Sequence, residues 1–149
     1  MNGENWEEDH LERKKVGQTK SVGFQVGVRK TFPIPQEKAW DLVASKEELQ
    51  LWLGKGSGIS LQPGQKYRTK TGIGEIRIVK PKQQLRLTWQ KEEWQRPSTV
   101  QIRIISKENN KTTISFHQEN LTDQYVREQM KEYWEMVLER IGERVQNPL

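Results

Sequence analysis

Between Ile73 and Asn120 the chain makes four consecutive runs in which apolar and polar side chains alternate. Strict alternation has the period of a half-buried β-strand, and each run places its large apolar groups on one side only. The stretch from Val22 to Phe32 alternates in the same way, and residues 59–61 and 66–69 are expected to be two shorter strands. We therefore predict an antiparallel sheet with one apolar face and one face in water.

Two short helices are expected between the first strand and the rest of the sheet. Pro35 suits the first turn of a helix over residues 36–44, because the amide hydrogen that proline lacks has no helical partner at that position. Ser45 and Glu48 have the spacing of a capping box, in which the serine oxygen accepts the Glu48 amide. A second helix is therefore predicted from there through residue 53.

The clearest element is an amphipathic helix close to the C-terminus. Thr122 is its expected N-cap, and Asn147-Pro148 ends it. Spacings of three and four, the period of one helix face, separate its apolar residues Val126, Met130, Tyr133, Trp134, Val137, Leu138, Ile141 and Val145. Burial of each large apolar side chain is worth about 1.5–3 kcal/mol, so this stripe has to pack against the apolar face of the sheet. The predicted fold class is α+β, with a curved antiparallel sheet of about seven strands wrapped on the long C-terminal helix and two short helices after the first strand.

Composition fits one domain with a heavily charged exterior. The chain has 149 residues, of which 32% are hydrophobic and 30% are charged. We expect residues 1–20 to be a flexible or loosely docked arm and residues 21–149 to form the domain. No apolar stretch approaches the ~20 residues that cross a bilayer, the acidic N-terminus lacks the layout of a signal peptide, and there is no cysteine. A cytoplasmic protein without a membrane partner is the expectation.

The charge balance argues against a nucleic-acid partner. The net charge is +5, but 25 Lys and Arg residues are mixed with 20 Asp and Glu. The longest basic block is Arg13-Lys14-Lys15, whereas a nucleic-acid footprint clusters positive charge on one face. Arg77, Arg86 and Arg103 alternate with the apolar residues of three predicted strands, so the solvent-exposed face of the sheet is expected to be basic.

Catalytic and metal-binding chemistry has no support in the sequence. His10 and His117 are the two histidines, they lie far apart, and neither has a carboxylate or histidine at ligand spacing. His117 is expected on the solvent-exposed face, so no Ser-His-Asp arrangement is predicted, and no carboxylate pair is expected in the interior. We therefore expect no metal, no cofactor and no enzymatic activity.

A bent sheet touches a helix along a line, so we expect a hydrophobic cavity between the two. Its predicted lining residues are Trp40, Trp52, Ile76, Ile78, Leu87, Trp89, Val100, Ile102, Phe116, Gln118, Met130, Tyr133 and Trp134. The alternative is that the tryptophans simply fill the core, as buried indole rings commonly do. Gln118 faces inward by parity, where its amide would orient a polar ligand group or a water; the alternative is a partly exposed position at the strand end. Lys30 has the same parity and the same two interpretations.

The order of these elements resembles the helix-grip fold of the START and birch-pollen-allergen (SRPBCC) superfamily. Seven short stretches occur in order along the chain, namely Phe32-Pro33-Ile34-Pro35, Lys38-Ala39-Trp40, Leu51-Trp52-Leu53-Gly54, Gly74-Glu75-Ile76, Leu85-Arg86-Leu87-Thr88-Trp89, Ser98-Thr99-Val100-Gln101-Ile102 and Tyr133-Trp134. Through these stretches residues 22–145 most resemble the branch typified by the C-terminal domain of the activator of the heat-shock protein 90 ATPase. The chain departs from the branch at Tyr133, where glycine is common, at Trp52-Leu53, where two aromatic residues are common, and at Pro63-Gly64, where two glycines are common. The bulk of Tyr133 is expected to shrink the cavity.

The resemblance implies a cavity for a lipid or another small molecule in the wider superfamily, and a chaperone-contacting domain in this branch. Our first hypothesis is a non-enzymatic binding protein for a small apolar or amphipathic ligand. The alternative is a protein-interaction module, similar to a co-chaperone of the stress response, that acts through the basic face of the sheet.

Overall fold

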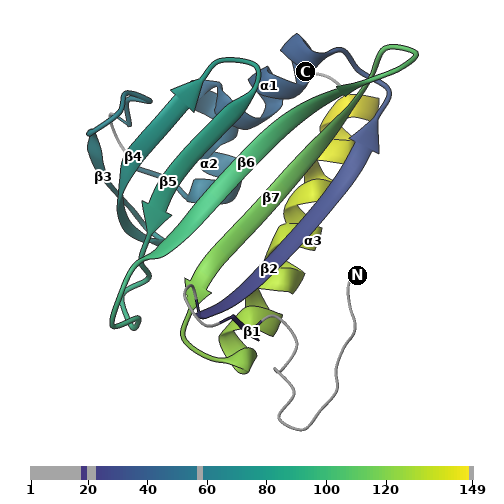
Figure 1. The fold of residues 1–149 in the computed structure, drawn as a ribbon. Helices are drawn as coiled ribbons and strands as arrows, with labels where there is room; N and C mark the ends of the chain where they lie inside the picture. The colour runs from purple at the N-terminus through teal and green to yellow at the C-terminus, as the bar shows by residue number, and fades with distance from the viewer. Residues whose placement is uncertain (1–17, 20–22, 57–58, 148–149) are drawn as a thin grey trace, which may run out of the picture.

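An antiparallel sheet forms one layer of the molecule, and a long helix lies across one of its faces (Figure 1). The computed structural model describes residues 18–19, 23–56 and 59–147. The elements are, in chain order, β1 (Gln18–Thr19), β2 (Gly23–Phe32), α1 (Gln36–Ala44), α2 (Lys46–Leu53), β3 (Lys66–Thr69), β4 (Gly72–Lys80), β5 (Gln84–Trp89), β6 (Ser98–Lys107), β7 (Lys111–Leu121) and α3 (Gln124–Gln146). The spatial order of the strands is β1-β2-β7-β6-β5-β4-β3, and each neighbouring pair is antiparallel.

The predicted fold class is confirmed, but one predicted strand is wrong. Residues 59–61 form no strand, because the amide of Gln62 turns back onto the carbonyl of Ser60 at 3.0 Å. The seventh strand is instead β1, at the other edge of the sheet. The predicted N-terminal arm falls on residues 1–20, of which the structure describes only the two residues of β1.

The helix boundaries follow from local hydrogen bonds. The Oγ of Ser45 accepts the Glu48 amide at 3.4 Å, which confirms the predicted start of α2. The N-cap of α3 is Asp123 and not Thr122, since Asp123 Oδ1 accepts the Val126 amide at 2.8 Å. A carboxylate at this position also complements the positive end of the helix dipole.

A β-bulge in β4 changes which side chains face the core. Ile76 pairs with Leu87, but Ile78 pairs with Arg86 and Val79 pairs with Leu85. One extra residue in a strand reverses the inward and outward positions that follow it. Val79 therefore packs against the core, and the prediction that Ile78 faces inward is wrong.

The core lies between the apolar face of the sheet and the helices. α3 packs mainly against β2 and β7, α1 packs against β6 and β7, and α2 touches α3. The indole N–H of Trp52 donates to the Val43 carbonyl at 3.0 Å, which ties α2 to α1. Among the described elements no helix covers the opposite face of the sheet, which is turned toward the viewer in Figure 1.

Candidate functional site

Six aromatic side chains from four elements and one loop form a single group in the interior. This aromatic cluster consists of Trp52, Trp89, Trp94, Phe116, Tyr133 and Trp134. Trp134 is at its centre, because the Phe116 ring stacks on it at 4.7 Å and the Trp89 ring meets it at 5.8 Å. The Trp52 ring approaches at 6.1 Å. Rings at such spacings are in contact, so the cluster itself occupies the space around Trp134.

A chain of buried hydrogen bonds runs beside the aromatic cluster. The indole N–H of Trp134 donates to Gln118 Oε1 at 2.8 Å, and Gln118 Nε2 donates to Ser98 Oγ at 2.8 Å. Ser98 Oγ in turn donates to the carbonyl of Trp89 at 2.7 Å. Gln118 thus faces inward as its parity predicts, and both ends of its amide already have protein partners.

Tyr133 takes part in the packing of the interior through its hydroxyl as well as its ring. The ring lies 5.7 Å from that of Trp89, and the hydroxyl donates to the backbone carbonyl of Trp52. Burial raises the pKa of the Tyr133 phenol to about 12, although Arg140 acts in the opposite direction. The hydroxyl therefore stays protonated and able to donate at neutral pH.

The indole N–H of Trp89 differs from the Gln118 amide and the Tyr133 hydroxyl in its hydrogen bonding. The Trp89 side chain is fully buried, and within the described part of the chain its Nε1 has no hydrogen-bond partner. It lies beside Gly72, where an added Cβ would come within 3.0 Å of Nε1. A buried donor without a partner costs about 1–3 kcal/mol.

The structure brings most of the predicted lining residues together. Ten of them are at most 1% exposed, namely Trp52, Ile76, Leu87, Trp89, Val100, Ile102, Phe116, Gln118, Met130 and Trp134. Tyr133 and Trp40 are half-buried and pack against this core, but Trp40 has no ring contact with the aromatic cluster. Ile78 lies on the outer face because of the bulge in β4. Lys30 is exposed, with its ammonium 5.7 Å from the centre of the Phe32 ring.

The outer face of the sheet carries many cations, and five of them away from the paired Lys107 and Lys111 are named the basic face. This basic face consists of Arg29, Arg77, Lys80, Arg86 and Arg103. Arg29 and Arg103 both pair with Ser115, from the two neighbouring strands, and Arg103 pairs in turn with Gln84. Lys80 pairs with Gln84 on the other side, and directly opposed residues of antiparallel strands share a face, so Arg29, Arg103 and Lys80 form a row across the sheet. Arg86 and Arg77 lie in the next row along the strands.

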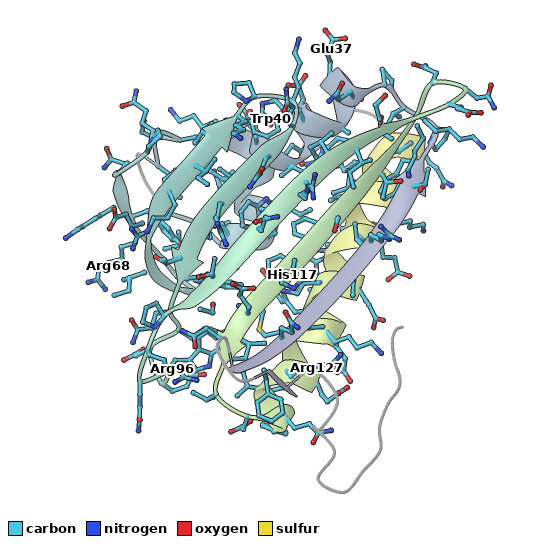
Figure 2. The ribbon with its side chains drawn as sticks, viewed as in Figure 1. Glu37, Trp40, Arg68, Arg96, His117 and Arg127 are labelled. Carbon is cyan, nitrogen blue, oxygen red and sulfur yellow. The ribbon has the colours of Figure 1, made fainter. Side chains whose placement is uncertain are left out.

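His117 lies in the middle of the same open face (Figure 2). Its Nε2 is 3.0 Å from Gln25 Oε1, and its Nδ1 is 3.8 Å from Glu119 Oε2. Glu119 also reaches Arg86 at 4.0 Å. The pKa of His117 is lowered, chiefly because partial burial disfavours the charged imidazole. Glu119 acts in the opposite direction, and Arg86 adds to the lowering of this pKa. The imidazole therefore adds no full positive charge to the basic face at neutral pH.

Among the hollows lined by described residues, two lie away from the aromatic cluster. One, of about 650 Å³, lies between β2 and α3 and is lined by Val28 and Met136 among others. The other, of about 590 Å³, lies beside the β3–β4 turn and is lined by Thr71 and Gln90 among others. Neither hollow is lined by a residue of the aromatic cluster.

Among the described residues, no group of three or more His, Cys, Asp or Glu side chains is placed so that it could bind a metal ion. In the part of the chain that the structure describes, no helix is both long and apolar enough to cross a membrane.

The family model described as "Activator of Hsp90 ATPase homolog 1-like protein" matches residues 33–146. This chain belongs to that family. The resemblance that the sequence motifs indicated is therefore confirmed. Among curated proteins, none matches the chain.

Members of this fold have been solved from several organisms. CalU16 from Micromonospora echinospora has a TM-score of 0.71 at 21% identity, over 83% of this chain and 76% of that one. An HSP90 activator from Plasmodium falciparum has a TM-score of 0.64 at 20% identity, over 74% and 86%. The Aha1 dimer from Colwellia psychrerythraea has a TM-score of 0.67 at 15% identity, over 83% and 96%. At these identities the similarity shows the fold alone.

Sequence reasoning missed two features of this family member. Ser98, at the start of β6, is the buried link between Gln118 and Trp89, yet a serine at a strand end gives no signal of this role. Arg29 completes the row of the basic face, and its exposed position in the first strand could have placed it there. The residues that neighbour Arg29 across the sheet can be identified only when β2 is known to pair with β7.

Proposed function

We propose that this protein is a non-catalytic interaction module whose basic face binds an acidic surface of a protein partner, and that the partner is an Hsp90-class chaperone. The observation that carries the proposal is the row of cations on a sheet face that no described helix covers. The family supports the class of partner, because its description and the relative from Plasmodium falciparum both refer to activation of Hsp90.

The spacing of the cations suits a surface that carries several carboxylates. Neighbouring strands lie about 4.8 Å apart, so the Cα atoms of Arg29 and Arg103 are about 10 Å apart, with Ser115 between them. The small side chain of Ser115 leaves room for a carboxylate that both guanidinium groups can reach. Arginine forks bind carboxylates in two parallel hydrogen bonds, which favours this kind of contact.

The interior supports a packed scaffold more strongly than a ligand site. Gln118 and Trp134 satisfy each other, and the rings around Trp134 are in contact. A ligand of any size would have to displace these side chains, at the cost of the contacts that they make.

The test is the affinity for a purified Hsp90 chaperone, measured with the double charge reversal Arg86→Glu and Arg103→Glu. We expect at least a tenfold loss of affinity and, for the unaltered protein, weaker binding as salt rises. The matched control reverses two exposed cations on the helices, Lys38→Glu and Lys46→Glu, which changes the net charge equally and should leave the affinity within about twofold. Equal binding by the face variant and the control would refute the proposal.

A second candidate, an apolar ligand in the interior, is favoured by the unpaired indole N–H of Trp89. A ligand oxygen close to Gly72 would supply the missing acceptor. Oleate and a plant polyphenol are suitable probes, because binding to the folded state raises Tm and quenches indole fluorescence. If neither compound changes either signal at concentrations well above those of the protein, this candidate is excluded for both classes of ligand.

A further inference from the structure

β2 presents an open edge along most of its length. β1 pairs only with Gly23 and Phe24, and Arg127 Nε donates to the Gln25 carbonyl at 2.8 Å. From residue 26 to residue 31 the strand has β7 as its only strand partner in the described part of the chain. Figure 1 shows β2 at this border of the sheet, with α3 behind it. Alternate N–H and C=O groups of an edge strand point away from its partner and can accept a further strand.

The hollow of about 650 Å³ runs along this edge, between the strand and α3. Its strand side includes Gly27 and Val28, and its helix side includes Leu138 and the exposed side chain of Met136. An added strand would therefore meet backbone hydrogen-bonding groups on one side and, beneath it, a wall of α3 on which Met136 and Leu138 lie among charged residues. A recess with these two properties is the arrangement used for strand addition.

The helix wall of the hollow is acidic. Glu132, Glu135 and Glu139 all line it and are exposed, and their spacing of three and four places them on one stripe of α3. These three carboxylates outnumber the two lysines of the lining, Lys131 on the same helix and Lys30 on the strand side. Side chains of a strand alternate between its two sides, so every second residue of an added strand would be directed to these carboxylates. The other residues would lie on the side of Arg29, which disfavours cations there.

We propose that the open edge of β2 binds an extended segment of a protein partner that carries lysine or arginine at every second position and uncharged residues between them. This site shares Arg29 with the basic face, but its carboxylates and open backbone groups belong to α3 and to the edge of β2, and the inference does not depend on the proposed function. A second copy of this chain is a poor occupant, because antiparallel pairing of two β2 edges centred on this stretch would bring Arg29 and Lys30 of both copies together.

The probe is the acetylated and amidated hexapeptide Lys-Thr-Lys-Thr-Lys-Thr, titrated into the full-length chain and followed by amide NMR shifts. We expect shifts at residues 26–31 and at residues 132–139. Two control peptides separate the contributions. The block sequence Lys-Lys-Lys-Thr-Thr-Thr has the same charge without the alternation, and a version methylated on alternate backbone nitrogens loses the edge hydrogen bonds. Each should bind at least tenfold more weakly.

Protein variants test the acidic wall. Glu135→Lys should weaken binding of the alternating peptide at least fivefold, whereas Glu143→Lys, an exposed acid on the same helix outside the hollow, should leave it unchanged. The Arg86→Glu and Arg103→Glu double variant should also bind the peptide as tightly as the unaltered protein, which keeps this result independent of the basic face.

Three results would overturn the proposal. Equal affinity for the block peptide would show attraction by charge alone, and equal affinity for the methylated peptide would show that no strand is added. Slow hydrogen exchange at the outward amides of residues 26–31 in the free protein would show that the chain itself, or a second copy, already covers the edge.

Discussion

The indole N–H of Trp134 donates to Gln118 Oε1 across 2.8 Å, and neither side chain is exposed. This bond joins α3 to the sheet at one defined position, because a buried amide or indole that loses its partner costs about 1–3 kcal/mol. The pair therefore fixes the position of the helix, while the surrounding rings supply most of the burial.

Replacement of Trp134 tests this role. Trp134→Phe removes the donor, leaves Gln118 Oε1 unsatisfied and opens a small cavity, so we expect a loss of about 2–4 kcal/mol in the free energy of unfolding. Urea denaturation followed by far-UV circular dichroism measures it. Trp94→Phe is the matched control, since Trp94 is half-buried in a loop, and it should cost about 1 kcal/mol or less.

The double variant Gln118→Leu and Trp134→Phe removes donor and acceptor together. Replacement of both partners avoids an orphaned polar group, so the double variant should be about 1 kcal/mol more stable than the sum of the single losses predicts. Strict additivity would mean that the hydrogen bond does not couple the two residues.

The hydroxyl of Tyr133 gives a second, smaller prediction. Tyr133→Phe loses the hydrogen bond to the Trp52 carbonyl and should cost about 0.5–1.5 kcal/mol, as measured by urea denaturation. Tyr125→Phe is the control, because Tyr125 is 71% exposed, and it should change stability by about 0.5 kcal/mol or less. A larger loss at Tyr125 than at Tyr133 would contradict the buried bond.

The same hydroxyl predicts how the free energy of unfolding changes at alkaline pH. The pKa of Tyr133 is about 12 in the folded state, above the ordinary value of 10.0, so the folded state holds this proton more tightly than the unfolded state. Its contribution to stability is constant below pH 10 and is lost as the pH rises from 10 to 12. Urea midpoints between pH 9 and pH 11 should therefore fall less steeply in Tyr133→Phe than in the unaltered protein.

Most of the fold follows from the order and period of the apolar residues. The spacing of three and four that contains Met130 and Trp134 predicts the buried face of α3, and parity places Leu87, Phe116 and Gln118 inside. These predictions succeed because the burial of large side chains dominates the energy of both elements. The contact partner of each side chain is harder to predict from the sequence, since it depends on which strands become neighbours.

The errors have a common physical cause. In β4 both Ile78 and Val79 are apolar, so the sequence contains no sign of the extra residue that turns Ile78 outward and Val79 inward. At the start of α3, Thr122 and Asp123 are both good N-cap residues, and which of them caps the helix depends on where β7 ends. The predicted cavity depends on ring positions, which no periodicity encodes.

The bulge in β4 makes a prediction of its own. Ile76→Ala removes a fully buried side chain that faces the core, and it should cost about 2–5 kcal/mol. Ile78→Ala removes a side chain opposite Arg86 on the outer face, and it should cost about 1 kcal/mol or less. Both values come from chemical denaturation. Equal losses would place the two isoleucines on the same face and would rule out the bulge.

His117 predicts how stability depends on mildly acidic pH. Its folded-state pKa is lowered from the ordinary value of 6.5, chiefly by partial burial. The unfolded state therefore binds the proton more readily, and stability rises with pH until the unfolded imidazole is neutral. The stabilisation is complete above a pH of about 6.5 and is lost as the pH falls below that value toward the folded pKa.

Urea midpoints at pH 5, 6, 7 and 8 measure this dependence, and His117→Gln should flatten the part between pH 5 and 6.5. Glutamine keeps a hydrogen-bonding group within reach of Gln25 and adds no titrating charge. NMR titration of the imidazole provides the direct check, with His10→Gln used to assign the two histidine signals. A His117 signal that titrates above 6.5 would mean that attraction to Glu119 outweighs the desolvation of the ring, and the stability slope would then have the opposite sign.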